Sequence, residues 1–340
     1  MRAVSQCRLA LVLLIWAHGE AVAGLLSPGD ILTANFFAGG SIVRVDPLTG
    51  TQAVIASDGN FRALSGIALD PSGAIFVTDL IQDEIIRVDA ATGAQTVVSA
   101  GNNLLFPVGI AIDAADNLLV ADRTAHAIIR INSTTGAQAV VSAGGSLSGD
   151  VGAGPNGIAI DAAGDIVVAS ARSGARDAGV VVRVDPRTGA QTVISEGGSL
   201  GSLNAIAIDA AGNYWVADGF GSIIRVNSTT GAQSVVSSDG SLAIPLGIAF
   251  DAAGGIVTDS APNPPGVSSI IRVDPFTGAQ TTVSSGGALL GPAGIAIVSS
   301  PAVPEPVTLV LCGIGLFAIW TVRRYRRDFE ARRILRSHPE

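Results

Sequence analysis

The chain has 340 residues, of which 14% are charged, so it is long enough for one large domain or two ordinary ones and shows no compositional sign of disorder. It contains 42 Gly, 16 Pro and no Lys, and it is rich in Ala, Val, Ile, Ser and Thr, which favours strands and tight turns. Residues 24–302 carry 11 Arg against 23 Asp and Glu, a net charge of −12. This balance argues against binding of nucleic acid, or of an anionic polymer by bulk electrostatics, and it is compatible with divalent cations.

The first 23 residues have the features of a secretory signal peptide. Arg2 and Arg8 flank a short basic region, residues 9–17 are apolar, and residues 21–23 form an Ala-Val-Ala cleavage site. We therefore expect the mature chain to begin at Gly24 and to be exported. The two cysteines, Cys7 and Cys312, lie outside the region between the two apolar segments, which excludes disulfides and thiol chemistry from the exported domain.

The mature chain contains an internal repeat. A GIAID-like element recurs six times, and an Arg that follows an apolar pair recurs at spacings of 42 to 53 residues, which predicts four-stranded propeller blades. The GIAID-like elements begin at Gly66, Gly109, Gly157, Ala205, Gly247 and Gly294, and the arginines are Arg44, Arg87, Arg130, Arg183, Arg225 and Arg272.

Each repeat reads as four strands, A to D, in the order GIAID, xIxVAD, IIRV and AQTVVS. An Asp-Ala-Ala-Gly turn or a variant of it joins A to B, and Asp/Asn-x-x-Thr-Gly joins C to D, as expected of hairpins. The mature chain starts with strands B, C and D in residues 31–55 and ends with a lone strand A in residues 294–298. We therefore predict an all-β, six-bladed β-propeller over residues 24–300, in which three strands from one end and one from the other complete a blade.

The periodic charges are interpreted as structural. Asp79, Asp122 and Asp218 recur at the ends of strand B, and the six arginines recur on strand C. Charges that follow the repeat favour cross-strand pairing or loop capping within the blades over catalysis.

The repeat resembles the NHL-repeat and gluconolactonase-like (senescence marker protein) six-bladed propellers. Pro155-Asn156-Gly157 matches the "PNG" signature of the latter family, in which such an Asn helps to hold a divalent metal ion, and Asn204 occupies the equivalent place in the next blade. The resemblance implies a metal site built from a Glu, two Asn and an Asp. Ser65 stands where that family has the Glu, so Asn156 and Asn204 are the metal ligands this chain offers, and Ca²⁺ or another divalent cation is the cofactor the resemblance implies. The other interpretation is that both Asn residues are structural turn residues.

The D-to-A and B-to-C loops vary between repeats, whereas the other turns are nearly invariant, so we place any ligand site on the variable face around the channel mouth. The six residues just before strand A lie nearest the axis: Ser65, Val108, Asn156, Asn204, Leu246 and Ala293. The predicted ligand-binding residues on this face are Asp150, Asn156, Arg172, Arg176, Asp177, Glu196 and Asn204. Asp150 and Glu196 could add charge to a metal site if they swing in.

His126 is the only histidine of the predicted propeller, so zinc sites built from His and most Ser-His-Asp triads are disfavoured. Virginiamycin-lyase-like propellers also use a His near the axis, and none of the six positions before strand A supplies one. No catalytic residue is assigned from the sequence.

The C-terminal region has three parts. Residues 301–306 are a linker that contains Pro304-Glu305-Pro306, residues 307–322 are apolar, and residues 323–340 form a basic tail that begins with Arg323 and Arg324. The apolar span predicts a transmembrane helix with a cytoplasmic tail. The order resembles a PEP-CTERM sorting signal, which implies processing by an exosortase near residues 304–306 in a Gram-negative bacterium that makes exopolysaccharide. The tail is longer than such signals usually have.

These features favour a non-enzymatic binding module that is exported, transiently anchored in the inner membrane and then located at the cell surface or in the extracellular matrix. Its expected partners are the exosortase and the membrane during sorting, and an exopolysaccharide, another glycan, a matrix component or a surface protein afterwards. The alternative is a metal-dependent lactonase or related hydrolase, in which Asn156 and Asn204 hold an ion that polarises a carbonyl.

Overall fold

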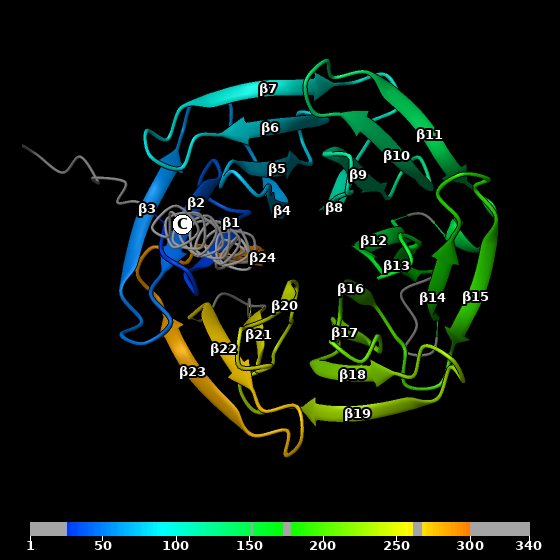
Figure 1. Ribbon diagram of the computed structural model, residues 1–340. Helices are drawn as coiled ribbons and strands as arrows, with labels where there is room; N and C mark the ends of the chain where they lie inside the picture. The colour runs from blue at the N-terminus through cyan, green and yellow to red at the C-terminus, as the bar shows by residue number, and fades with distance from the viewer. Residues whose placement is uncertain (1–25, 151, 173–177, 261–266, 300–340) are drawn as a thin grey trace, which may run out of the picture. The chain divides into compact units, whose positions relative to one another are not determined.

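A computed structural model of the chain describes residues 26–150, 152–172, 178–260 and 267–299. Within these ranges the chain forms six four-stranded antiparallel sheets that stand around a central axis (Figure 1). The six-bladed propeller is thereby confirmed. The predicted signal peptide and the whole C-terminal sorting region lie outside the described residues. In the part of the chain that is described, no helix is long and apolar enough to span a lipid bilayer.

The strands occupy four positions from the axis outward, as predicted for strands A to D. The innermost strands are β4 (Leu64–Leu69), β8 (Pro107–Ile112), β12 (Gly154–Ile160), β16 (Leu203–Ile208), β20 (Ile248–Phe250) and β24 (Pro292–Ile297). The second strands are β1 (Ile31–Asn35), β5 (Ile75–Asp79), β9 (Asn117–Asp122), β13 (Ile166–Ala171), β17 (Tyr214–Asp218) and β21 (Ile256–Ser260). The third strands are β2 (Ser41–Val45), β6 (Glu84–Val88), β10 (Ala127–Asn132), β14 (Gly179–Val184), β18 (Ser222–Val226) and β22 (Ser269–Val273). The outermost strands are β3 (Gln52–Ser57), β7 (Gln95–Ala100), β11 (Gln138–Ala143), β15 (Gln191–Glu196), β19 (Gln233–Ser238) and β23 (Gln280–Ser285). A short 3₁₀ helix, η1 (Gly145–Leu147), follows β11.

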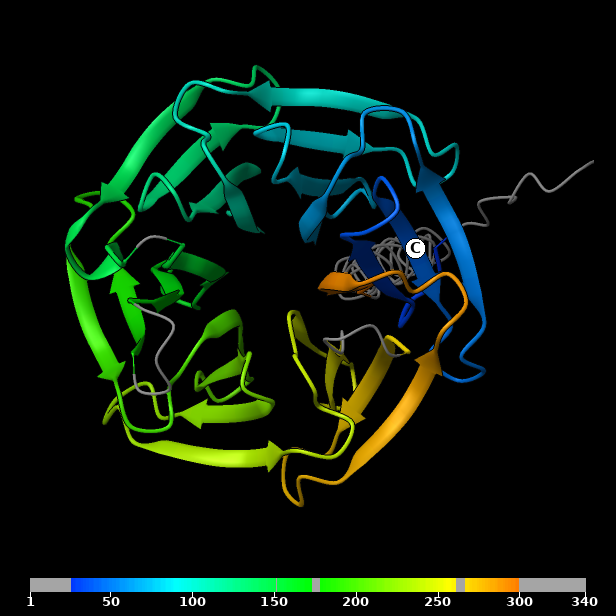
Figure 2. The same cartoon turned by 180° about the vertical axis from the view of Figure 1, so that it is seen from behind.

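Blade 1 contains strands from both ends of the described chain. Strand β24 pairs with β1 in antiparallel register, with Ile31 opposite Ile297, and β2 and β3 complete the sheet. Backbone bonds from Gly29 N to Val298 O (2.8 Å) and from Val298 N to Asp30 O (2.9 Å) extend the pairing. Both views show the last strand, in orange, beside the first strands, in blue (Figures 1 and 2). The predicted closure with three strands and one strand is therefore confirmed. Blades 2 to 6 follow in chain order, β4–β7 to β20–β23.

The hydrophobic core lies between neighbouring blades. The second strands are buried on both faces, which explains their runs of Ile, Val, Leu and Ala, whereas the outermost strands are mostly exposed or half-buried. In one of six similar clusters, Leu119 and Ile128 of blade 3 pack against Ile166 and Val182 of blade 4. Because each cluster joins two blades, no blade buries its apolar faces alone.

Glycine recurs at the innermost strands because the strands approach one another closely there. A Cβ atom added to Gly109 would lie 2.1 Å from the carbonyl oxygen of Asn156, and one added to Gly294 would lie 2.3 Å from that of Ser65. Only a residue without a side chain fits such contacts. The Gly of the GIAID-like repeat is therefore explained by the close packing of six strands around one axis.

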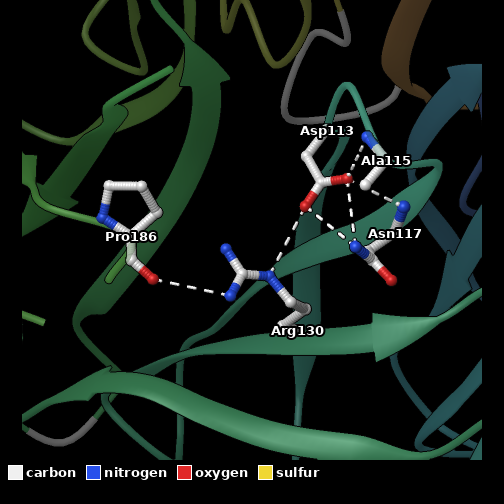
Figure 3. Close-up of polar contacts among 5 residues, drawn as sticks. All are labelled: Asp113, Ala115, Asn117, Arg130 and Pro186. Carbon is white, nitrogen blue, oxygen red and sulfur yellow. Dashed lines mark hydrogen bonds and ion pairs between the residues drawn. The ribbon is translucent and has the colours of Figure 1, made fainter. Parts of the chain in front are cut away.

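Asp residues beside the turn between the first and second strands pair with the recurrent Arg on the third strand of the same blade. Asp113, after β8, accepts backbone hydrogen bonds from Ala115 and Asn117 (both 2.9 Å), and its other oxygen lies 3.4 Å from Nε of Arg130 on β10 (Figure 3). Arg130 also donates to the carbonyl of Pro186 in the next blade (3.5 Å). Although partial burial raises the pKa of Asp113, the hydrogen bonds from Asn117 and Ala115 and the charge of Arg130 outweigh it and leave the pKa below its usual value. Similar pairs join Asp30 to Arg44, Asp161 to Arg183, Asp209 to Arg225 and Asp251 to Arg272.

A glutamine at the start of each outermost strand joins its blade to the preceding one. Nε2 of Gln191 donates to Ser142 Oγ and Gly144 O (both 3.0 Å), and its Oε1 accepts from Ser146 N (2.7 Å). Gln52 makes the same three contacts with the last blade, to Ser284 Oγ (2.9 Å), Gly286 O (3.0 Å) and Ala288 N (2.6 Å). We call this arrangement the glutamine clasp; the remaining members are Gln95, Gln138, Gln233 and Gln280.

We expect Gln52→Ala to lower the free energy of unfolding by about 1–3 kcal/mol, because it removes three hydrogen bonds at the interface where the ring closes and leaves part-buried polar groups without a partner. Urea denaturation followed by circular dichroism measures the change. Gln191→Ala is the matched control at an interface within the ring. An unchanged midpoint for both variants would show that the clasp does not stabilise the propeller.

Candidate functional site

The D-to-A and B-to-C loops lie at one end of the propeller, and a narrow cavity opens on the axis at this end. It is lined by the six predicted residues that precede the GIAID-like elements and by the two residues that follow each of them, and its volume is about 80 Å³. A single water molecule needs about 10–15 Å³ on this measure, so the cavity has room for a few waters. The predicted positions of Ser65, Val108, Asn156, Asn204, Leu246 and Ala293 around the axis are therefore confirmed.

Asn156 uses both ends of its amide within the protein. It is buried, its Nδ2 donates to the carbonyl of Leu203 in blade 5 (2.7 Å), and its Oδ1 accepts from Nε of Arg123 in blade 3 (2.7 Å). Asn156 itself begins the axial part of blade 4. One side chain thus ties three consecutive blades together at the cavity rim.

Asn204 is bound within the protein through the nitrogen of its amide only. Its Nδ2 donates to the carbonyl of Pro245 in blade 6 (2.9 Å). No contact joins the two Asn side chains among the described residues, and each one is fixed to the backbone of the blade that follows. Both residues lie in strands, β12 and β16, and not in turns as the second interpretation had it. Asn204 keeps its Oδ1 without a hydrogen-bond partner in the described chain.

The donor set around the axis does not fit a divalent metal ion. Asn156 Oδ1, the oxygen that the resemblance assigns to the metal, accepts a hydrogen bond from a guanidinium cation. A positive charge at that distance opposes a second cation, and the described residues that line the cavity include no carboxylate to offset it. In the described ranges, no group of three or more His, Cys, Asp or Glu side chains is arranged to hold a metal.

The other predicted site residues do not gather at the axis. Arg172 and Glu196 form an ion pair with 2.8 Å between Nη1 and Oε2, and both side chains are about half exposed (41% and 57%). The backbone N–H of Asp150 donates to Arg172 O (2.7 Å). These three residues thus lie together on the loops of blade 4, and none contacts Asn156 or Asn204 in the described structure. Arg176 and Asp177 lie outside the described residues.

Arg123 is the site residue that the sequence analysis missed. It directly follows β9 in the B-to-C loop of blade 3, and its guanidinium carbon lies 5.4 Å from the centre of the Phe106 ring. Within the described chain no carboxylate lies within 4.0 Å of it, and burial lowers the pKa of Arg123. A signal was present in the sequence, because the positions equivalent to Arg123 in the other blades are Phe36, Leu80, Ala171, Gly219 and Ala261. Arg123 is thus the one charged residue at a position that is uncharged in the other five repeats.

His126 lies in the same loop as Arg123. It has a positive φ of 49°, its carbonyl accepts from Gly144 N (2.9 Å), and its buried Nδ1 has no hydrogen-bond partner among the described residues. Gly154 packs against this loop, since a Cβ there would lie 2.5 Å from Arg123 O and 3.1 Å from His126 Nδ1. His126 is thus a loop residue and lies away from the six axial positions.

Asp259 is a buried carboxyl group next to the cavity wall. Its Oδ1 accepts hydrogen bonds from Leu246 N (2.8 Å) and Gly247 N (2.7 Å), while its Oδ2 has no partner in the described structure. It lies one register position before the repeated Asp, whose place in β21 is taken by Ser260. Burial raises the pKa of Asp259 to about 7, because ionisation would place a charge where water cannot solvate it.

Comparison with known proteins extends these findings. A family model described as "SMP-30/Gluconolactonase/LRE-like region" matches residues 65–258. A chain from the crystal structure of a nidogen/laminin complex is similar in fold, with a TM-score of 0.65, 18% identity, and coverage of 79% of this chain and 98% of that chain. A streptogramin B lyase has a TM-score of 0.51, 15% identity and coverage of 78% and 74%. The virginiamycin B lyase of Staphylococcus aureus has a TM-score of 0.50, 17% identity and coverage of 64% and 69%. No curated protein has significant sequence similarity to the chain.

We expect Asp259→Asn to remove a pH dependence of stability. The pKa of Asp259 is raised on folding, so between about pH 4 and pH 7 the folded state keeps a proton that the unfolded state loses, and the free energy of unfolding falls as the pH rises. Asn keeps the acceptor for Leu246 and Gly247. The stability of the variant relative to the parent chain should therefore rise by about 2–3 kcal/mol between pH 5 and pH 8, as measured by urea denaturation.

The control for this measurement is Asp274→Asn. Hydrogen bonds from the backbone of Thr277 and Phe276 lower the pKa of Asp274, so its contribution is lost only as the pH falls below the usual range of an Asp. Its stability curve should stay parallel to that of the parent chain from pH 5 to pH 8. A parallel curve for Asp259→Asn would mean that the buried carboxyl does not titrate in this window.

Proposed function

The chain belongs to the SMP-30/gluconolactonase/LRE-like family, and from that premise we propose that its propeller is a non-enzymatic binding module of the cell envelope. The module uses the face formed by the D-to-A and B-to-C loops, and its ligand is a glycan, a matrix component or a surface protein. Repetition supports this choice, because most polar side chains of the blades are engaged in contacts that recur from blade to blade.

The hydrogen bond between Arg123 Nε and Asn156 Oδ1 is the observation that carries the proposal. A guanidinium is charged at every physiological pH, so the amide oxygen is permanently turned towards a cation. A divalent ion would have to displace Arg123 and would then find neutral side chains such as Ser65 and Asn204 in place of carboxylates. The metal-dependent lactonase is the alternative, favoured by the Pro155-Asn156-Gly157 motif and by the family match.

Export and surface sorting are part of the proposal, and they rest on the sequence of both ends. Residues 1–23 direct export, Pro304-Glu305-Pro306 and the apolar residues 307–322 direct sorting by an exosortase, and Arg323 and Arg324 keep the tail in the cytoplasm.

We expect the surface form of the protein to be shorter than the synthesised chain at both ends. Mass spectrometry of the chain released from the cell surface should find an N-terminus at Gly24 and a C-terminus near residues 304–306. The unprocessed form should accumulate in the membrane fraction of cells that lack the exosortase. A surface form that retains residues 307–340 would contradict processing.

A titration distinguishes the two functions. We expect isothermal titration of the full-length chain with Ca²⁺, Mg²⁺ and Zn²⁺ to show no binding, and we expect retention of the chain on immobilised envelope polysaccharide or matrix material from the source cells. Metal binding that is lost in Asn156→Ala would favour the lactonase, as would metal-dependent hydrolysis of a sugar lactone. Asn204→Ala is the matched variant, because it changes the neighbouring amide, which Arg123 does not contact.

A further inference from the structure

Arg123 is a cation without a counter-charge in the described part of the protein. Arg44, Arg130, Arg172, Arg183, Arg225 and Arg272 each have a carboxylate within 4.0 Å. Arg62 donates to two backbone carbonyls, Arg87 lies exposed on β6, and Arg187 lies in the turn between β14 and β15 at the other end of the propeller. Arg123 is held between the Phe106 ring and Asn156, and Asn156 lines the axial cavity.

The outer part of the guanidinium is free to bind a ligand. Nε is engaged by Asn156, which fixes the plane of the group. Nη1 and Nη2 make no hydrogen bond with any described residue, and neither is among the polar atoms that are sealed from solvent. Two parallel N–H donors on a fixed plane match the two oxygens of a carboxylate, and this bidentate pairing is stronger than a neutral hydrogen bond.

Partial burial without a counter-charge is costly for a cation, and an anion that binds there removes the cost. We propose that Arg123 binds a single carboxylate, carried by a uronate sugar unit in an otherwise neutral glycan. This inference rests on the proposed function and names the ligand of its variable face.

Charge near Arg123 restricts the ligand to few anionic groups. Burial and repulsion from Asp122 and Asp79 raise the pKa of Asp83 in the loop of blade 2, and the pKa of Glu84 is raised in the same way by burial and Asp79. Residues 24–302 carry a net charge of −12, so they would repel a polyuronate along its length. A ligand with a single carboxylate can place that group on Arg123 and keep its neutral part against the rest of the surface.

A sugar fits the remaining groups at the rim better than a peptide end does. Ser65 and Asn204 line the cavity, where the Ser65 hydroxyl can donate to or accept from a ring hydroxyl and Asn204 Oδ1 can accept from one. The axial cavity, at about 80 Å³, admits only the edge of a ligand, so the sugar ring stays outside, at the level of Arg123 and Phe106.

The test is a ligand-observed NMR titration of the full-length chain in a non-ionic detergent, with methyl glucuronide as the probe and methyl glucoside as its neutral match. We expect the glucuronide to bind, the glucoside not to bind, and Arg123→Gln to weaken glucuronide binding at least tenfold. Arg187→Gln removes the same charge from the opposite end and should bind as the parent chain does. Arg123→Lys keeps the charge but lacks the two parallel N–H donors, so it should bind the glucuronide with intermediate affinity. If Arg123→Gln does not fold, the affinity of Arg123→Lys tests the inference.

Other outcomes of these binding measurements would contradict either the role of Arg123 or the binding module. Equal glucuronide binding by the parent chain and Arg123→Gln would overturn the inference, as would N-acetylalanine binding as tightly as the glucuronide, or a polyuronate binding more tightly per residue. Retention on envelope polysaccharide without glucuronide binding would overturn the role of Arg123 and leave the binding module standing. Glucuronide binding that needs Arg123, without retention on any envelope material, would support the carboxylate site and overturn the module.

Discussion

Closure of the ring is the constraint on which the rest of the molecule depends. Each apolar cluster is shared by two blades, so an open row of six would expose the flanks of its first and last members to water. Pairing of β24 with β1 covers these flanks. At this closing interface, Gln52 makes the same hydrogen bonds that the other clasp glutamines make between the other blades. The axial contacts at Gly109 and Gly294 follow from the same requirement, because six innermost strands must meet around one line.

This constraint determines which residues are available for function. The glutamine clasps and the axial glycines recur because every blade must make the same two interfaces, and the Asp and Arg pairs recur within single blades. A side chain engaged in such contacts has little freedom to bind a ligand. Arg123 and Asp259 depart from the repeat: Arg123 is bound through Nε alone, and Asp259 leaves its buried Oδ2 without a partner in the described structure.

The sequence alone was sufficient for the fold and for the position of the axial rim. The number of GIAID-like elements gives the number of blades, and the lone late strand gives the closure, since both follow from spacing. The site was less accessible to such reasoning. The partner of Asn156 is Arg123, 33 residues earlier and in another blade, and nothing in the local pattern around Asn156 indicates it. Likewise, Asp259 lies one register position before the recurrent Asp of other blades, and its raised pKa depends on burial in the folded chain, which the spacing does not reveal.

The hydrogen bond between Arg123 and Asn156 bears on the choice between the two proposed functions. A metal ion and a guanidinium are both cations that an amide oxygen such as that of Asn156 can hold. A metal accepts lone pairs, so it can polarise a carbonyl or lower the pKa of a bound water. A guanidinium only donates hydrogen bonds and keeps its protons, so it attracts an anion without activating a nucleophile. In the proposed binding module, Arg123 occupies the amide oxygen of Asn156 and supplies a positive charge suited to recognition of an anion.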